Sequence, residues 1–196
     1  APSVLGESTS ALAGEVISDD FGPETTLAAP WRFLDPSNDS AYSMSGSHAV
    51  LQVAGGSSHD LWKGAGNMSA LRLLQPVLNT DFGVETRFES TPTQAYQLQG
   101  IAVQVTDTNL LRTGMYHTGS ALKLFAAHVT TNSTKTYVSS TLPDGIAPQY
   151  LRLERTGNDW TYSFSYDGTT WNVGATFALA LAVTEVGVYA GNAGNA

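Results

Sequence analysis

The first candidates for chemistry are two acids, Glu85 and Glu89, four residues apart in a predicted strand. Residues with this spacing share one face of a strand, and two carboxyl groups are what glycoside hydrolysis requires. At ordinary strand rise their Cα atoms would be about 13 Å apart, whereas a retaining enzyme holds its carboxyl groups about 5 Å apart. Arg87 lies between them and would keep both acids ionised, which is wrong for a general acid. The pattern therefore favours Glu–Arg–Glu pairing over catalysis.

A second group of polar side chains would share one face of a sheet if the predicted strands near 83–90, 99–106 and 110–117 are neighbours. Alternation separates the apolar from the polar side chains of each strand. The polar set is Glu85, Arg87, Gln104, Arg112 and Tyr116, with Gly100, Ala102 and Gly114 among them. Planar polar groups bind hydroxyls, an aromatic ring stacks on a sugar ring and glycines leave room, so this face predicts a carbohydrate site. The alternative is a solvated face with cross-strand ion pairs.

The third candidate is the loop residues His59-Asp60-Leu61-Trp62, which are followed by the glycine-containing stretch 63–67. Trp62 could stack on a sugar, with His59 and Asp60 as hydrogen-bonding partners. Alternatively, Trp62 closes one end of a sandwich core. Trp160 and Trp171 belong to a regular aromatic hairpin and are predicted to lie in the core.

Other chemistries find little support in the sequence. There is no cysteine, which excludes disulfides, thiolate catalysis and Cys-ligated zinc, and the four histidines lack zinc-ligand spacing. No Gly-x-Ser-x-Gly elbow or phosphate-binding loop occurs. Tyr116-His117 near Arg112 could serve a lyase or hydrolase as base and acid, but a solvated strand end is the simpler interpretation. The net charge of -8 argues against nucleic acid as a partner, and no apolar run is long enough to span a membrane.

These side chains would be positioned by short strands separated by turns. The clearest alternation is 160–166, where aromatic residues alternate with Thr and Ser, and Asp167-Gly168 then predicts a hairpin turn. A dozen such strands predict an all-β fold of two antiparallel sheets packed as a jelly-roll sandwich. We expect residues 1–15 to form a linker or short N-terminal segment, 16–192 the sandwich, and 193–196 a frayed tail.

A series of short motifs resembles a known family. In order, they are Ser18-Asp19-Asp20-Phe21, Trp31-Arg32-Phe33-Leu34-Asp35-Pro36, His59-Asp60-Leu61-Trp62, Arg72-Leu73-Leu74-Gln75, Asp81-Phe82-Gly83-Val84-Glu85-Thr86, Asn109-Leu110-Leu111-Arg112 and Val186-Gly187-Val188-Tyr189-Ala190-Gly191-Asn192. Their order and spacing over residues 17–192 resemble the concanavalin A-like lectin/glucanase superfamily, and most of all the beta-xylosidase C-terminal-like accessory modules of bacterial glycosidases.

The resemblance implies where ligands would bind. Glycans usually lie across the concave sheet of this fold. Related sandwiches often hold a structural calcium ion where the first and last strands meet, so Asp20 or Asp19, with Asn192, could supply oxygen ligands. The alternative is that Asp20 merely caps a turn.

Three hypotheses for function remain. The first is a non-catalytic carbohydrate-binding module, tethered to other domains of a secreted enzyme that acts on poly- or oligosaccharides. The second is a glycoside hydrolase or polysaccharide lyase on the same scaffold, and the third is a structural or adhesion module. A secreted or extracellular location is expected because only 13% of the residues are charged, and Ser, Thr, Asn, Gln and Gly supply the polarity instead.

Overall fold

A computed structural model describes residues 15–23, 25–64 and 66–194 of the chain. The predicted N-terminal linker, apart from Glu15, and the last two residues of the predicted tail lie outside the described residues. The only helix in the described part is a single 3₁₀ turn, Pro143–Gly145. No helix there has the length and apolar character needed to cross a membrane.

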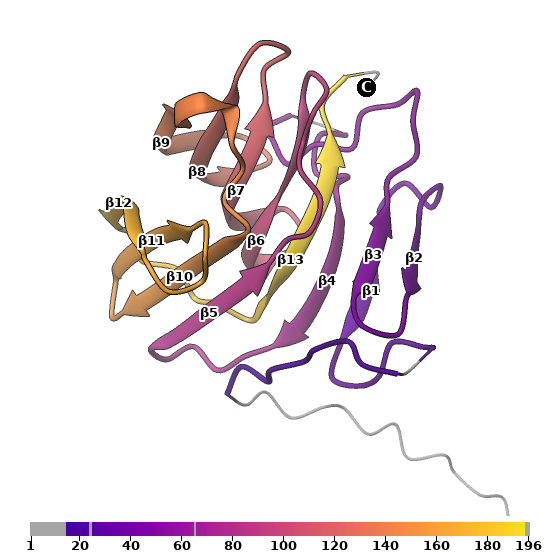
Figure 1. The fold of residues 1–196 in the computed structure, drawn as a ribbon. Coiled ribbons are helices and arrows are strands. Elements are labelled where there is room, and N and C mark those ends of the chain that lie inside the picture. Colours follow the sequence, from indigo (N-terminus) through magenta and orange to yellow (C-terminus); the bar gives the residue numbers. More distant parts are fainter. Residues whose placement is uncertain (1–14, 24, 65, 195–196) are drawn as a thin grey trace, which may run out of the picture.

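Two antiparallel sheets make up most of the molecule (Figure 1). The larger has seven strands in the order β1 (Arg32–Leu34), β4 (Leu71–Pro76), β13 (Glu185–Asn192), β6 (Gln97–Thr106), β7 (Asn109–His117), β8 (Leu122–Thr130) and β9 (Thr134–Thr141). The smaller has four strands in the order β12 (Asn172–Ala178), β11 (Asp159–Ser165), β10 (Tyr150–Thr156) and β5 (Phe82–Arg87). A separate hairpin of β2 (Ala41–Met44) and β3 (Ala49–Gln52) lies at the side of the sandwich away from β9 and β12. The predicted all-β, two-sheet antiparallel sandwich is confirmed.

The main core lies between the two sheets, because alternate residues of the facing strands are apolar. Ile101 and Val103 of β6 pack there with Leu151 and Leu153 of β10. Trp160 is 1% exposed, and its indole Nε1 donates to the Leu179 carbonyl at 2.9 Å. The prediction for Trp160 is therefore confirmed.

The prediction that Trp171 lies in the core is wrong. Its ring is half-buried on the outer side of the small sheet, where the Arg152 guanidinium lies 3.7 Å from the ring centroid. Trp171 directly precedes β12, and the register between β11 and β12 shifts between Tyr162 and Ser163, so the inward alternation of the hairpin does not extend to this position.

A second apolar cluster covers the outer face of the seven-stranded sheet. Residues 59–64 and 66–70, the covering segment, fold over this face and bury Leu61 and Met68 against Leu98, Leu110 and Phe125 of β6, β7 and β8. The Gly64 amide, which donates to the Thr131 carbonyl at 2.9 Å, anchors the segment to the turn after β8. This cover turns part of an otherwise solvated face into an enclosed environment.

Candidate carbohydrate-binding cavity

A cavity of about 250 Å³ lies on this outer face, between the strands β6, β7 and β8 and residues Asp60 and Trp62 of the covering segment. Its lining residues are Asp60, Trp62, Tyr96, Leu98, Arg112, Tyr116, Phe125 and Ala193. Four of the eight were predicted as site residues from sequence, two from the sheet face and two from the loop. The structure therefore merges the sheet-face and loop hypotheses into one site.

Arg112 is the polar centre of the cavity, and it is only 3% exposed. Its Nη1 donates to the Leu61 carbonyl at 2.7 Å and to Asp60 Oδ1 at 3.1 Å. The guanidinium carbon lies 4.9 Å from the ring centroid of Phe125 and 5.5 Å from that of Tyr189. These contacts fix the Arg112 side chain before any ligand arrives.

Asp60 is oriented by the backbone of its own loop. Its Oδ1 also accepts from the Leu61 amide at 2.7 Å, and its carbonyl accepts from the Ser69 and Ala70 amides. The Asp60 side chain is 16% exposed, against 4% for Arg112, so the anion is the more accessible member of the pair.

Aromatic rings form the walls of the cavity. Phe125 makes an edge contact with Tyr116, with centroids 5.5 Å apart, and a tilted contact with Trp62 at 6.1 Å. Trp62 is half-buried, and its amide donates to the Asn67 carbonyl at 2.8 Å. Trp62 therefore packs over the outer face of the sheet and does not close the end of the core between the sheets.

Tyr96 is a site residue that the sequence analysis missed. It directly precedes β6, is 52% exposed and has a left-handed backbone with φ of 66°. Its amide donates to the His117 carbonyl at 2.6 Å, and its carbonyl accepts from Ala193 at 2.9 Å. The sequence signal was an aromatic residue in a polar, proline-containing stretch, 90–95, next to a predicted strand.

The sequence suggested that the glycines of this face leave room for a ligand, and this prediction is wrong. A Cβ on Gly100 would meet the Thr113 carbonyl oxygen, and one on Gly114 would meet the Gln99 carbonyl oxygen. The same Gly114 Cβ would lie 2.6 Å from the Tyr189 hydroxyl. Both positions are glycine because β6 and β7 approach closely and a buried tyrosine packs over them.

Gln104 is predicted in the same site, but its side chain is engaged elsewhere. It is fully buried, accepts from Arg72 Nη1 at 3.0 Å and donates to Asp107 and Glu185 at 3.0 and 2.8 Å. Burial lowers the pKa of Arg72 to about 10, so Arg72 remains a cation at neutral pH. Gln104 therefore belongs to a buried charged network outside the cavity.

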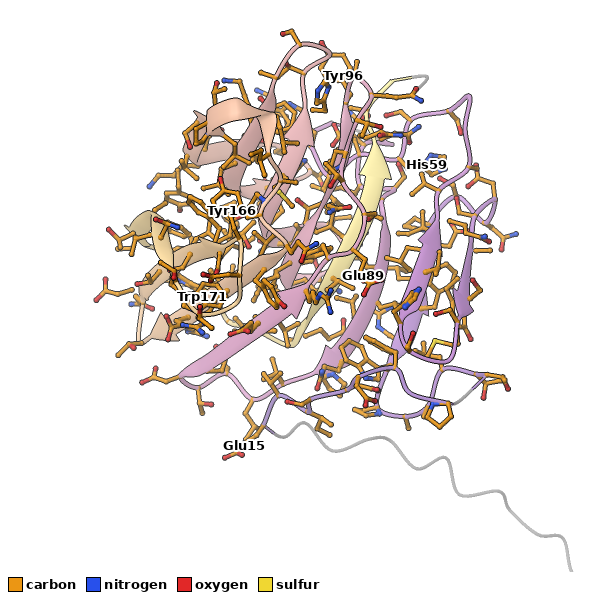
Figure 2. All side chains as sticks on the ribbon, viewed as in Figure 1. Glu15, His59, Glu89, Tyr96, Tyr166 and Trp171 are labelled. Atoms are coloured by element: carbon orange, nitrogen blue, oxygen red, sulfur yellow. The ribbon has the colours of Figure 1, made fainter. Side chains whose placement is uncertain are left out.

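The side chain of His59 is likewise held by contacts within the protein. It is fully buried, with Nε2 2.8 Å from Asp39 and Nδ1 3.0 Å from the side chain of Asn192. Burial lowers the pKa of His59, but the hydrogen bonds to Asp39 and Asn192 outweigh this and raise it overall. His59 joins the start of the covering segment to the end of β13 (Figure 2).

The expectation that residues 83–90 neighbour the β6 strand is wrong. The β5 strand pairs with β10 in the other sheet, so Glu85 and Arg87 do not meet Arg112 and Tyr116. Glu85 accepts from Arg152 at 2.8 Å, and Glu89 lies 3.8 Å from Arg87.

Glu85 and Arg87 line a separate hollow of about 540 Å³ between β5, the hairpin and the segment before β1, and a second hollow of about 440 Å³ adjoins it. Aromatic and polar side chains line these hollows too, among them Trp31 in the larger and Tyr189 in the second. We assign the candidate site to the smaller cavity because it joins sheet-face and loop residues that the sequence predicted.

Asp20 accepts from the Gly22 amide at 3.0 Å, which matches the turn-capping alternative. Asn192, its expected partner, is bonded to His59. Among the residues that the structure describes, no group of three or more His, Cys, Asp or Glu side chains could hold a metal ion. Calcium near Asp20 stays a prediction.

The fold and the cavity define a two-sheet β-sandwich module with a small aromatic site on one outer face. Residues 37–195 match a protein-family model, and the chain belongs to that family, which is described as protein of unknown function, DUF1349. A comparison with curated proteins gives no match.

Solved structures show the same fold. A functionally unknown protein from Saccharomyces cerevisiae is 17% identical, with a TM-score of 0.65 over 83% of this chain and 86% of that one. A xylan beta-1,4-xylosidase from Bacillus halodurans is 17% identical, with a TM-score of 0.66 over 89% of this chain and 35% of that one. The GH43 protein BlXynB from Bacillus licheniformis is 19% identical, with a TM-score of 0.65 over 90% and 35%.

The chain thus spans about a third of the length of the GH43 protein and of the xylosidase. The predicted resemblance to a sandwich found in beta-xylosidases is confirmed at the level of the fold. Membership of the concanavalin A-like superfamily stays a prediction.

Proposed function

We propose that this chain is a non-catalytic carbohydrate-binding module that holds a sugar in the cavity around Arg112. The observation that carries this is the grouping of three rings with polar tips, those of Trp62, Tyr96 and Tyr116, around a fixed Asp60–Arg112 pair. Such rings offer an apolar face to the C–H side of a sugar, while their tips and the ion pair bind hydroxyls.

The size of the cavity agrees with this ligand class. Pockets for drug-sized ligands occupy roughly 300–1,000 Å³, so 250 Å³ suits about one sugar ring. Because Arg112 and Asp60 are already bonded to each other and to backbone, little side-chain freedom is lost on binding.

The setting that we propose is a larger, secreted carbohydrate-active enzyme. The similarity to about a third of the GH43 protein and of the xylosidase supports an accessory role beside other domains. We keep a structural calcium ion near Asp20 in the proposal, as a stabilising element separate from the sugar cavity.

The alternative, a glycoside hydrolase or polysaccharide lyase, has no specific observation in its favour. The carboxylate of Glu85 is bonded to Arg152, and Glu89 lies near Arg87 and His48. Of the pair Tyr116-His117, which could serve as base and acid, the His117 Nδ1 accepts from the Gly119 amide at 3.0 Å.

A glycan array, followed by overnight incubation of each bound glycan with the chain, tests the proposal. We expect retention of at least one glycan and no new reducing ends. Release of reducing ends that vanishes in Glu85→Gln would overturn the binding module in favour of the enzyme.

A further inference from the structure

The backbone of Tyr96 lies in a conformation that tyrosine rarely adopts. Only three described non-glycine residues have positive φ, namely Phe21, Asn38 and Tyr96. This region brings the Cβ of any non-glycine residue close to the following carbonyl, and asparagine tolerates it because its short polar side chain bonds locally, which the tyrosine ring does not do. The bonds from Tyr96 to His117 and Ala193 hold this strained geometry in place.

The Tyr96 side chain contributes little to the stability of the sandwich. Tyr96 is 52% exposed, and within the described residues its hydroxyl has no hydrogen-bond partner. The residue lies toward the same end of the molecule as His59 (Figure 2), where its ring borders the cavity that also contains Trp62 and Tyr116. Strained residues of this kind persist where the surrounding structure enforces them, and they cluster at ligand sites.

The charges of the cavity restrict the class of ligand. Its one cation, Arg112, and its one anion, Asp60, are bonded to each other, and the anion is the more exposed of the two. Asp60 already balances the charge of Arg112, so a carboxylate on a ligand would add an unbalanced negative charge beside Asp60. A sugar without charge can use the remaining acceptor oxygen of Asp60 and the tips of the rings.

We infer that Tyr96 determines specificity by stacking on an uncharged sugar ring at the mouth of the cavity, and that the fold keeps it strained for this contact. The inference rests on the proposed carbohydrate-binding function. Tyr96 then contacts the ligand directly, and the affinity depends on its ring and not on the backbone of the loop.

Two substitutions separate the ring from the backbone. Tyr96→Asn removes the ring and suits the left-handed conformation, so we expect a melting temperature equal to or about 2 °C above that of the wild type. We expect its affinity for the best neutral glycan of the array, measured by calorimetry, to fall at least about fivefold. Tyr96→Phe keeps the ring and should retain most of the affinity.

The outcomes distinguish the inference from the function on which it rests. Normal affinity in Tyr96→Asn, or a marked fall in its melting temperature, would overturn the inference while carbohydrate binding stands. Retention of uronic-acid glycans alone would overturn the uncharged class. Retention of no glycan by the wild type would instead refute the proposed function, and this inference with it.

Discussion

The Arg112 side chain should stabilise the fold as well as the cavity, and Arg112→Ala tests this. The substitution removes the donor to the Leu61 carbonyl at 2.7 Å and to Asp60 at 3.1 Å from a site that is 3% exposed. Removing one partner of a buried pair costs about 3–5 kcal/mol, and the partial exposure of Asp60 places the expected loss at about 3 kcal/mol. For a chain of this length that corresponds to a fall in melting temperature of roughly 6–12 °C.

Urea denaturation at pH 7 measures this loss as a lower midpoint with an unchanged slope. The matched control is Arg152→Ala, because Arg152 also pairs with a carboxylate, that of Glu85 at 2.8 Å, but the side chains are 32% and 43% exposed. An exposed ion pair contributes about 0–1 kcal/mol and an exposed cation–π contact, such as that of Arg152 with Trp171, about 0.5–1 kcal/mol, so the control should lose no more than about 1–2 kcal/mol. Equal losses in the two variants would refute the argument that burial of Arg112 makes its contacts strong.

Three further predictions concern packing, pH and metal. Gly114→Ala should lower the free energy of unfolding, measured in urea, by about 3 kcal/mol or more, because the new methyl group would meet the backbone of β6 and the Tyr189 hydroxyl. A near-neutral effect would show that β6 and β7 can separate. The pKa of His59 is raised, so the stability that its protonated form adds should be complete below about pH 6.5 and lost as pH rises through the folded-state pKa. Burial lowers the pKa of His128, so the stability linked to its neutral form should be lost only as pH falls below about 6.5. Urea midpoints against pH should therefore decline above pH 6.5, and a decline that persists in His59→Gln would contradict this assignment. A calcium ion near Asp20 should make the melting temperature fall in chelator, and unchanged melting together with no metal in elemental analysis would remove the ion.

Local sequence patterns were sufficient for most strands, because each strand of this sandwich has one face in a core. The run 160–166 illustrates this, with Trp160 and Tyr162 buried as the alternation predicts. The short strand β1 was not predicted, since three residues carry too little periodicity. Parity also placed Arg112 and Tyr116 on one face correctly.

Strand order is not contained in such patterns. Parity says on which side of its own strand Glu85 points, but only long-range pairing decides that β5 joins β10 and not β6. Gln104 and His59 were expected at a ligand site because both are polar, yet contacts with residues far along the chain bury them. The left-handed conformation of Tyr96 has no signature in the neighbouring residues, because glycine or asparagine would be expected there.

The central claim is that the cavity around Arg112 binds sugar, and calorimetric titration of one array-positive glycan into Trp62→Ala and Tyr116→Ala tests it most directly. Each change removes a ring from the cavity wall, so we expect each to weaken binding by roughly fivefold or more, while Trp171→Ala on the other sheet leaves binding unchanged. Normal binding by Trp62→Ala and Tyr116→Ala, with loss of binding in Trp171→Ala, would contradict the account and place the site on the small sheet.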